Sequence, residues 1–321
     1  MRKSQFIFAL MLSTSFATMA RADDTSLANC LKAAGEGNCV QIGTSGTYYA
    51  LSGDAGNQTM TVYGTKESGS TAATVPSAAF YSFQTDRSTL PGGVTSLKTS
   101  GNVDIREYAF YSASGLTSID LTGVKTIEYA AFYGATGLTS ANLTGVQIIE
   151  DEAFEGATGL TSVDLTGVKT IREYAFEGAT GLTSVDLTGV QSIGYMAFYD
   201  ATNLTSIVIS DSLLDDDGNI LGWEEESGDY TGIDATAFQN TGLSTIYCPK
   251  GKTCGNSFEE VGTLKTIPYS IDENGQIKAG GKTYASLDDL ASGNHIVKRI
   301  YTIDEANAVA GKKNRVSIKY R

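Results

Sequence analysis

Hydrophobic residues recur every 22 residues through the middle of this 321-residue chain. Leucines open five successive copies of one phrase, and the other apolar residues of each copy keep the same offsets. Ser, Thr, Asp and Gly fill most positions between them. The apolar residues of the copy at 116–137 are Leu116, Ile119, Leu121, Val124, Ile127, Ala131 and Phe132. A fixed short period is typical of stacked supersecondary units rather than of one globular core.

The spacing within each copy predicts its local structure. Ile119 and Leu121 alternate with Ser118 and Asp120, which indicates a short strand with one buried face. Gly123 then allows the chain to turn. The later apolar positions favour a short helical or 3₁₀ turn whose inner side packs back on the strand.

One such unit cannot bury its apolar side alone, whereas stacked copies can, with parallel strands about 4.8 Å apart. The sequence therefore predicts an α/β repeat solenoid. We expect a leucine-rich-repeat-like stack of short parallel strands with short helical or 3₁₀ segments, capped at both ends. Its core would contain an aromatic ladder made of Phe110, Phe132, Phe154, Phe176 and Phe198.

The repeated phrase resembles the BspA-like leucine-rich repeat family. The residues that carry the resemblance are Leu160-Thr-Ser-Val163-Asp-Leu165, then Ile171, then Ala175-Phe176. The resemblance extends from residue 94 to about 248, roughly half the chain. It implies a secreted or cell-surface bacterial protein that binds other molecules, often in adhesion, and it offers no catalytic residues to transfer.

The N-terminus predicts export. Arg2 and Lys3 precede the apolar run Phe6–Leu12, and Ala20-Arg21-Ala22 offers a small-x-small cleavage site. The alternative is an N-terminal anchor, for which the apolar run is too short. No other segment could span a membrane. We therefore expect a protein that is secreted, or held at the cell surface or in the periplasm, after Sec-type export.

Changes of pattern divide the rest of the chain. Residues 1–22 are the expected signal peptide, and 23–93 an N-terminal cap region containing strand-like runs near 47–51 and 59–63. The array occupies 94–248, with an insertion at about 210–232 that displaces one Ala-Phe pair to Ala237-Phe238. Residues 249–294 form a linker and hairpin region, with Asn274-Gly275 as the hairpin turn. Residues 295–321 form a basic segment that is predicted as strand, helix and strand.

The net charge of the chain limits the kinds of partner that it can bind. Removal of residues 1–22 leaves 20 basic and 36 acidic side chains, a net charge of −16. Such a surface repels nucleic acid. Residues 295–321 are the exception, with seven basic and two acidic side chains. This segment is either an envelope attachment or, as we favour, a cap whose charges complement the acidic array.

The four cysteines indicate disulfides, because the chain is predicted to be exported. They fall in two close pairs on either side of the array, so local pairing of Cys30 with Cys39 and of Cys248 with Cys254 is favoured among the three possible pairings. Metal binding is the alternative, but the chain has a single histidine. We therefore expect no metal site.

The exposed side of the strands is the first candidate binding surface. Thr117, Asp120, Asn142, Asp164 and Asp186 are predicted to point away from the core on successive coils. Hydroxyls and carboxylates in such a row could bind a polar polymer, either a glycan or an extended peptide. Asp164 and Asp186 are neighbours whose like charges a cationic ligand would relieve. The alternative is that these residues only keep the sheet soluble.

Three further features have competing interpretations. The insertion holds the only tryptophan, Trp223, and insertions in solenoids often form the binding face. Tyrosines that follow the ladder are either interface residues or the cover of a coil edge; they are Tyr111, Tyr133 and Tyr199. Asp215-Asp-Asp-Gly-Asn219 resembles a calcium loop but lacks the alternating ligands and the final Glu of an EF-hand, which favours a tight turn.

Catalysis has little support in the sequence. The only histidine, His295, lies in the basic segment, and no phosphate-binding loop, zinc-protease motif or nucleophile elbow is present. We expect neither an enzyme nor a cofactor. The sequence instead indicates adhesion to, or recognition of, a protein or glycan on host or neighbouring cells. The alternative is a structural envelope or matrix spacer anchored by its basic C-terminal segment.

Overall fold

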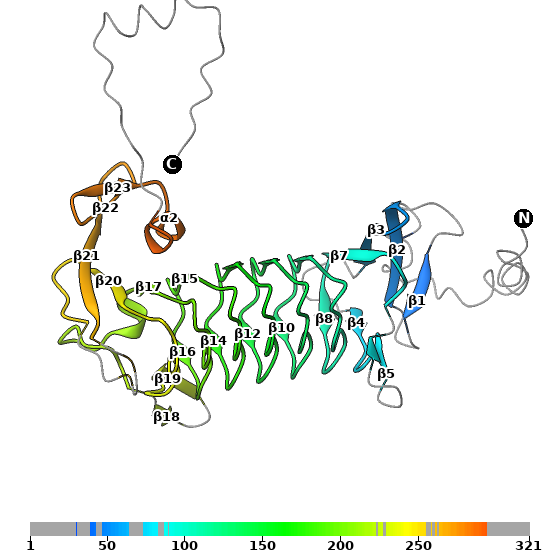
Figure 1. Ribbon diagram of the computed structural model, residues 1–321, viewed down its shortest axis with the longest axis horizontal. Coiled ribbons are helices and arrows are strands. Elements are labelled where there is room, and N and C mark those ends of the chain that lie inside the picture. Colours follow the sequence, from blue (N-terminus) through cyan, green and yellow to red (C-terminus); the bar gives the residue numbers. More distant parts are fainter. Residues whose placement is uncertain are drawn as a thin grey trace, which may run out of the picture.

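The computed structural model describes residues 30, 39–42, 47–63, 73–82, 87–88, 90–222, 224–226, 229–254, 258, 261 and 263–293. They form an elongated stack of coils with a hairpin at the N-terminal end and a small β–α module at the C-terminal end (Figure 1). The predicted solenoid of short parallel strands is confirmed.

One strand from each coil contributes to a front sheet, and we call its outer surface the strand face. Neighbouring strands pair at the repeat spacing, so that Ser118 lies beside Ser140 and Asp120 beside Asn142. The front strands are β7 (Val94–Ser100), β9 (Ser118–Asp120), β11 (Ser140–Asn142), β13 (Ser162–Asp164), β15 (Ser184–Asp186), β17 (Ser206–Val208) and β20 (Thr245–Pro249).

A second strand in each coil, which the sequence pattern did not predict, contributes to a back sheet. Its residues pair in the same way, with Ile127 beside Ile149 and Ile149 beside Ile171. In chain order the back sheet contains β4 (Ala73–Val75), β8 (Val103–Ile105), β10 (Thr126–Ile127), β12 (Ile148–Ile149), β14 (Thr170–Ile171), β16 (Ser192–Ile193), β18 (Glu224–Glu226) and β19 (Asp229–Ile233).

The return segment of each coil, expected to be helical or 3₁₀, is a series of turns. Two of its residues have left-handed φ, as at Glu152 (58°) and Gly156 (68°), and such residues interrupt a right-handed helix. The turns free the backbone to bond to the next coil instead. The amide of Phe132 donates to the carbonyl of Ala153, and that of Phe154 to Ala175, both at 2.8 Å.

The predicted phenylalanine ladder fills the core. From Phe110 to Phe238, successive ring centroids lie 5.2–5.3 Å apart and the rings are within 7° of parallel. Phe80 extends the stack at one end and Phe258 closes it edge-on at the other. The side chains from Phe110 to Phe238 are fully buried. The ladder is therefore longer than the regular repeat.

The insertion leaves the stack unbroken. Phe198 and Phe238 are 40 residues apart in the chain, yet their rings stack at 5.2 Å. The extra residues leave the coil as the 3₁₀ helix η1 (Asp211–Leu213) and the β18–β19 hairpin. Leu213 and Leu214 anchor the loop in the core, and β19 pairs with β16 so that the next coil starts in register.

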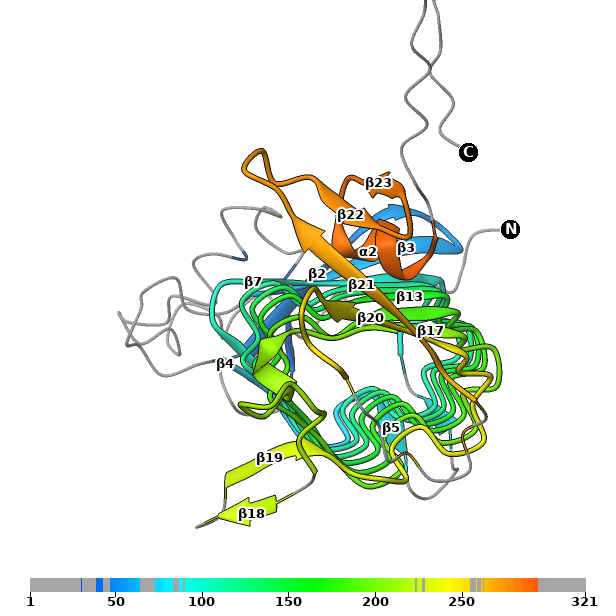
Figure 2. The same ribbon diagram turned by 90° about the vertical axis from the view of Figure 1, so that its left-hand side faces the viewer.

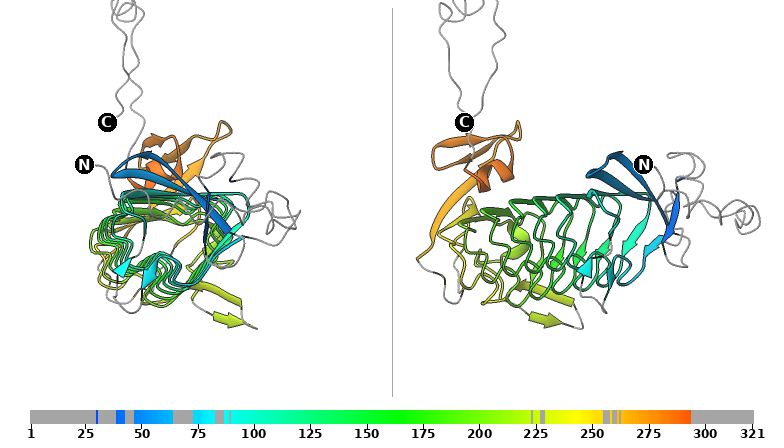
Figure 3. Two further views of the ribbon diagram at one scale, coloured as in Figure 1. Left: turned by 90° about the vertical axis from the view of Figure 1, so that its right-hand side faces the viewer. Right: turned by 45° about the vertical axis from the view of Figure 1, so that its right-hand side comes forward.

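The N-terminal end is closed by an antiparallel hairpin. β2 (Thr47–Asp54) pairs with β1 (Val40–Ile42) and with β3 (Asn57–Tyr63), and β3 then runs parallel to β7. Figure 3 shows this hairpin rising beside the strand face. The Cys30–Cys39 disulfide is formed. A separate two-stranded ribbon consists of β5 (Tyr81–Ser82) and β6 (Arg87–Ser88).

Residues 265–293, which we call the C-terminal module, continue the front sheet and fold back over it (Figure 2). β21 (Lys265–Ile271) runs parallel to β20 and then makes the expected hairpin with β22 (Ile277–Ala279). β23 (Lys282–Tyr284) and the helix α2 (Leu287–Ala291) follow. The Cys248–Cys254 disulfide is formed just before this module.

No helix among the described residues is long and apolar enough to cross a membrane.

Replacing Phe154 with Ala tests the stacking. We expect a loss of about 3–5 kcal/mol in the free energy of unfolding, because the truncation removes both ring contacts and leaves a cavity. Urea unfolding followed by circular dichroism measures this loss. The exposed Thr158, in the same coil, supplies the control Thr158→Ala, which should change stability by less than about 0.5 kcal/mol. Equal stability of the two variants would contradict a stacked core.

Candidate binding site on the strand face

One repeat position places a single side chain per coil in a straight row on the strand face. Strand register sets Asn142 between Asp120 and Asp164. Asp186 continues the row on the next coil. The structure therefore brings four predicted site residues onto one surface. In chain order the whole row is Lys98, Asp120, Asn142, Asp164, Asp186, Val208 and Tyr247.

Each Asp or Asn of this row also closes the turn that follows its strand. The Oδ1 atom of Asn142 accepts a hydrogen bond from the Thr144 amide at 3.0 Å, and Asp186 Oδ1 accepts from the Thr188 amide at 2.9 Å. Such side-chain-to-backbone bonds are a property of Asx turns. The repetition of Asp and Asn thus has a structural reason, although Asn would serve as well as Asp.

Thr117 is exposed, but its hydroxyl is used within the scaffold. Its Oγ1 donates to the Thr95 carbonyl at 3.0 Å, and Thr139 Oγ1 donates to the Thr117 carbonyl at 2.8 Å. Thr161 and Thr205 repeat the bond to the preceding coil. These threonines link neighbouring coils along one edge of the strand face, which makes Thr117 a weaker candidate for ligand binding than the carboxylates.

The C-terminal module covers the last strands of the row. Ser206 Oγ donates to the Ala291 carbonyl at 2.5 Å, and Tyr269 Oη donates to the Ile209 carbonyl at 3.0 Å. Val208, where earlier coils carry Asp or Asn, is fully buried against Leu290 and its neighbours in the module. Helix α2 therefore stands on β15 and β17 and forms a wall beside Asp186.

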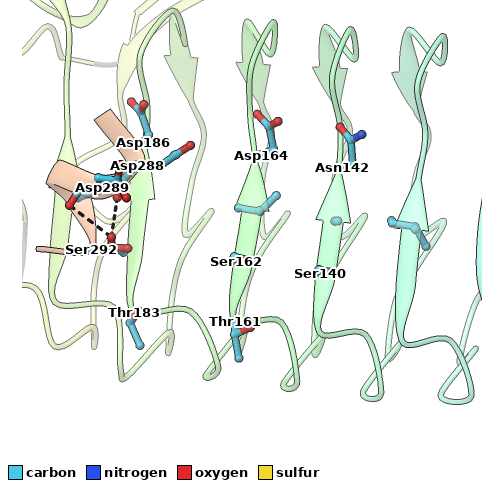
Figure 4. A pocket seen from close by; sticks show the side chains of 15 residues that line it. Ser140, Asn142, Thr161, Ser162, Asp164, Thr183, Asp186, Asp288, Asp289 and Ser292 are labelled. Atoms are coloured by element: carbon cyan, nitrogen blue, oxygen red, sulfur yellow. Dashed lines mark hydrogen bonds between the residues drawn. The ribbon is translucent and has the colours of Figure 1, made fainter. Parts of the chain in front are cut away.

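The wall and the row enclose a hollow of about 530 Å³ on the strand face (Figure 4). Asp164 and Asp186 come from the front strands, whereas Asp288 and Asp289 come from α2. We call this the acidic hollow. Its other lining residues are Ile119, Ser140, Ala141, Asn142, Thr161, Ser162, Val163, Thr183, Ser184, Ala291 and Ser292.

The carboxylates of the acidic hollow repel one another. Burial raises the pKa of Asp186, the Thr188 hydroxyl and amide oppose that rise, and Asp164 adds to it. Partial burial, Asp186, Asp164 and Asp289 together raise the pKa of Asp288. No described lysine or arginine forms an ion pair with any of these four groups. The ion pairs of the described chain are Arg106–Glu128, Arg172–Glu150 and Lys278–Asp272.

The front sheet is interrupted at the acidic hollow. β13 is the last strand of one hydrogen-bonded sheet and β15 the first of another, although the back sheet continues across the same two coils. Asp164 and Asp186 belong to these two strands and are the only pair of adjacent carboxylates in the row. Like charges on facing strands disfavour pairing. We attribute the open seam to this repulsion.

The predicted tyrosines cover a coil edge and are not part of the lining of the hollow. Tyr111 and Tyr133 stack at 4.6 Å and 1°, and the hydroxyl of Tyr199 accepts a bond from Asn240 Nδ2 at 3.0 Å. Glu155 occupies the equivalent position in a middle coil. Burial, together with the nearby charges of Glu177 and Glu152, raises the pKa of Glu155 to about 7. Ring stacking within this row indicates that the tyrosines stabilise the coil edge.

The aspartate-rich segment Asp215–Asn219 is a tight turn. Asp215 Oδ1 accepts from the Asn219 amide at 2.8 Å, and Gly218 has a φ of 82°. The Gly218 carbonyl accepts from the amides of Thr253 and Cys254, so the turn braces the second disulfide. Among the described residues, no group of three or more His, Cys, Asp or Glu could hold a metal ion. Trp223 and His295 lie outside the described residues.

Sequence reasoning missed Asp288 and Asp289, because no local pattern shows that α2 folds back onto a strand 100 residues earlier. One signal was available. The row changes from Asp to Val at 208 while the surrounding phrase is retained, and an apolar residue at an exposed position indicates that another part of the chain covers it.

Comparison with known proteins identifies the repeat. Residues 103–217 match the family model of the BspA type leucine rich repeat region, in six copies. Among curated proteins, no sequence matches the chain.

Several solved structures are similar to this chain at low sequence identity. A leucine-rich repeat protein from Bacteroides ovatus is 20% identical (64% of this chain, 58% of that chain, TM-score 0.37). A leucine rich cell surface protein from Faecalibacterium prausnitzii is 18% identical (74% and 60%, TM-score 0.36). The pneumococcal vaccine antigen PcpA is 16% identical (72% and 70%, TM-score 0.43). The chain thus spans about three fifths of the first two.

Replacing Asp186 with Asn tests the repulsion. The Asn side chain keeps the oxygen that accepts the turn hydrogen bond, as Asn142 shows. It removes the charge of residue 186, which lies near Asp164, Asp288, Asp289 and Tyr269. A carboxyl whose pKa is raised by folding destabilises the protein once the pH exceeds that pKa, and the cost disappears at lower pH, where both states are protonated. We therefore expect Asp186→Asn to melt at higher temperature than the parent at pH 7 but not at pH 3.

Thermal melts across this pH range make the comparison. Asp186→Ala is the matched control, since it removes the charge and also the turn acceptor, which costs about 0.5–1.5 kcal/mol. A gain for Asp186→Asn that persisted unchanged at pH 3 would rule out charge repulsion as its cause.

Proposed function

We propose that this chain, whose repeat array belongs to the BspA-type leucine-rich repeat family, is an exported recognition protein that binds an extended, positively charged ligand in the acidic hollow. The observation that supports this most directly is the convergence of carboxylates from two distant segments. Asp164 and Asp186 of the array meet Asp288 and Asp289 of α2 across one hollow. The repeat supplies the first pair and the C-terminal module supplies the second.

The shape of the hollow favours an extended ligand. Its lining runs over four successive front strands, from Ile119 to Asp186, and one side is bounded by α2. A lysine- or arginine-bearing peptide segment fits the charge, whereas a neutral glycan would hydrogen-bond the four carboxylates but leave their charge uncompensated. Polar side chains of the floor, Ser162 and Ser184 among them, can hydrogen-bond a peptide backbone. We thus favour a protein partner over a glycan.

The expected location fits this role. The N-terminal pattern of Arg2, Lys3 and the run Phe6–Leu12 directs export, and two disulfides are formed in the folded chain, as is usual for exported proteins. In this proposal the protein presents its strand face outside the cytoplasm and mediates adhesion to host or neighbouring cells. Recognition needs no catalytic group, and we propose none.

The double variant Asp164→Asn with Asp186→Asn tests the site. Fluorescence anisotropy with an extended lysine-rich peptide as the probe should show saturable binding to the parent, weakened about tenfold or more in the variant, since charge-assisted contacts are lost. Binding should also fall with added salt. The control Asp216→Asn with Asp217→Asn removes the same charge from exposed positions outside the hollow and should bind like the parent.

Equal affinity of the hollow variant and the control would remove the hollow from the binding site. Binding of a neutral oligosaccharide without binding of the lysine-rich peptide would contradict a peptide ligand and indicate a glycan ligand instead.

The regular phenylalanine ladder favours a second candidate, a rigid envelope or matrix spacer. The ladder repeats from coil to coil with little variation, and the threonine bonds recur at four of the coils. Deletion of one whole coil, residues 160–181, separates the two functions. We expect this variant to fold and to melt cooperatively, because the flanking coils carry the same apolar residues at nearly all of the same offsets, with the array shortened by about 4.8 Å.

Under the recognition proposal the deleted chain binds the lysine-rich peptide more weakly, since Asp164 leaves the lining of the hollow and Asn142 takes its place beside Asp186. Unchanged adhesion by cells that express the shortened chain would support the spacer instead.

A further inference from the structure

The acidic hollow holds negative charge that no described basic side chain neutralises through an ion pair. Four carboxylates line it, and no described lysine or arginine pairs with them. The pair Asp164 and Asp186 also coincides with the seam at which β13 and β15 fail to pair. Any cation seated there would offset the repulsion that holds these two strands apart.

The chain itself leaves the described structure at the rim of this hollow. Helix α2 ends at Ala291, and both Ala291 and Ser292 line the hollow. Ser292 Oγ donates to the Asp288 carbonyl at 2.7 Å, which fixes the end of the helix beside the carboxylates (Figure 4). Gly293 is the last described residue. The next segment of the chain therefore starts within reach of the site.

That next segment has the complementary charge. Residues 295–321 contain seven basic and two acidic side chains, whereas residues 23–294 contain 13 basic and 34 acidic ones. Its first cations, Lys298 and Arg299, come five and six residues after Gly293. An extended chain covers about 17 Å in five residues, comparable with the width of the four front strands that line the hollow. Length and charge both suit the site.

We propose that the chain's own basic segment, residues 295–321, is the resident occupant of the acidic hollow, with Lys298 and Arg299 facing Asp164, Asp186 and Asp288. A tethered segment has an effective concentration of the order of millimolar, so that even weak ion pairs keep it bound. The contact neutralises the hollow and covers the seam.

The regulatory consequence rests on the proposed function. An external cationic ligand would have to displace the basic segment, which makes recognition selective for partners that bind more tightly than the chain's own lysines and arginines. The occupancy itself does not depend on that function, and it is testable without an external ligand.

Zero-length carbodiimide cross-linking of the full mature chain tests the occupancy. This reagent joins a lysine amine to a carboxylate only where the two are in contact. We expect peptide mass spectrometry to find Lys298 linked to Asp164, Asp186, Asp288 or Asp289, and these links to disappear in high salt. The exposed Asp216, Asp217 and Glu273 are internal controls that Lys298 should link at background level. Links of Lys298 spread evenly over hollow and control carboxylates would overturn the proposal.

Mixing ¹⁵N-labelled and unlabelled chains identifies the donor of the segment. Links within one isotopic chain support the proposal, and links that join the two isotopic forms show that a second copy provides the segment and overturn it.

The variant Lys298→Gln with Arg299→Gln links this contact to recognition. It should bind the lysine-rich peptide about tenfold more tightly than the parent, because the tethered competitor is weakened. Lys312→Gln with Lys313→Gln removes the same charge further along the segment and should have the smaller effect. Specific cross-links without any peptide binding would leave the occupancy standing and sink the proposed function alone. Peptide binding without specific cross-links would do the reverse.

Discussion

The distance between neighbouring coils is the constraint on which this structure depends. Two interactions impose nearly the same value. Parallel strands require about 4.8 Å, and the phenylalanine rings stack at 5.2–5.3 Å. Because both hold at once, each coil lies directly over the one before it. The insertion after β17 shows how strictly the coil spacing is kept. The extra residues leave the stack, and the ring of Phe238 still stacks on that of Phe198.

The same constraint creates the electrostatics of the strand face. A 22-residue repeat stacked in register places equivalent side chains one coil apart, whatever their charge. At most positions this is harmless, and the threonine hydroxyls even gain a carbonyl acceptor from it. At Asp164 and Asp186 it brings two carboxylates together, and the front sheet opens between them. Asn142 separates Asp120 from Asp164, and there the sheet is continuous. This contrast between one amide and one carboxylate is the basis on which we attribute the seam to charge repulsion.

The repetitive part of this fold could be predicted from sequence because its information is periodic. The front strands, the ladder, the displaced Phe238 and the hairpin at Asn274-Gly275 all follow from spacing or from a local turn signal. The return turns could not be predicted in this way. Their left-handed φ values occur at Tyr108, Glu152 and Tyr174, and these residue types give no sequence signal for a left-handed conformation. Only half of the acidic hollow could be predicted from sequence. Its strand residues belong to the repeat, but Asp288 and Asp289 join them because the C-terminal module folds back over the strand face, and Val208 is the only sequence signal of that fold-back.

The interrupted front sheet also has a mechanical meaning. Between most coils, tension along the solenoid axis is shared by the front ladder, the back ladder and the stacked rings. Between β13 and β15 the front ladder contributes nothing, while the back strands β14 and β16 remain paired and Phe176 still stacks on Phe198. A pulling force applied to the two ends would therefore be carried off-centre at that point, and the array would bend open there toward the strand face before any other pair of coils parted.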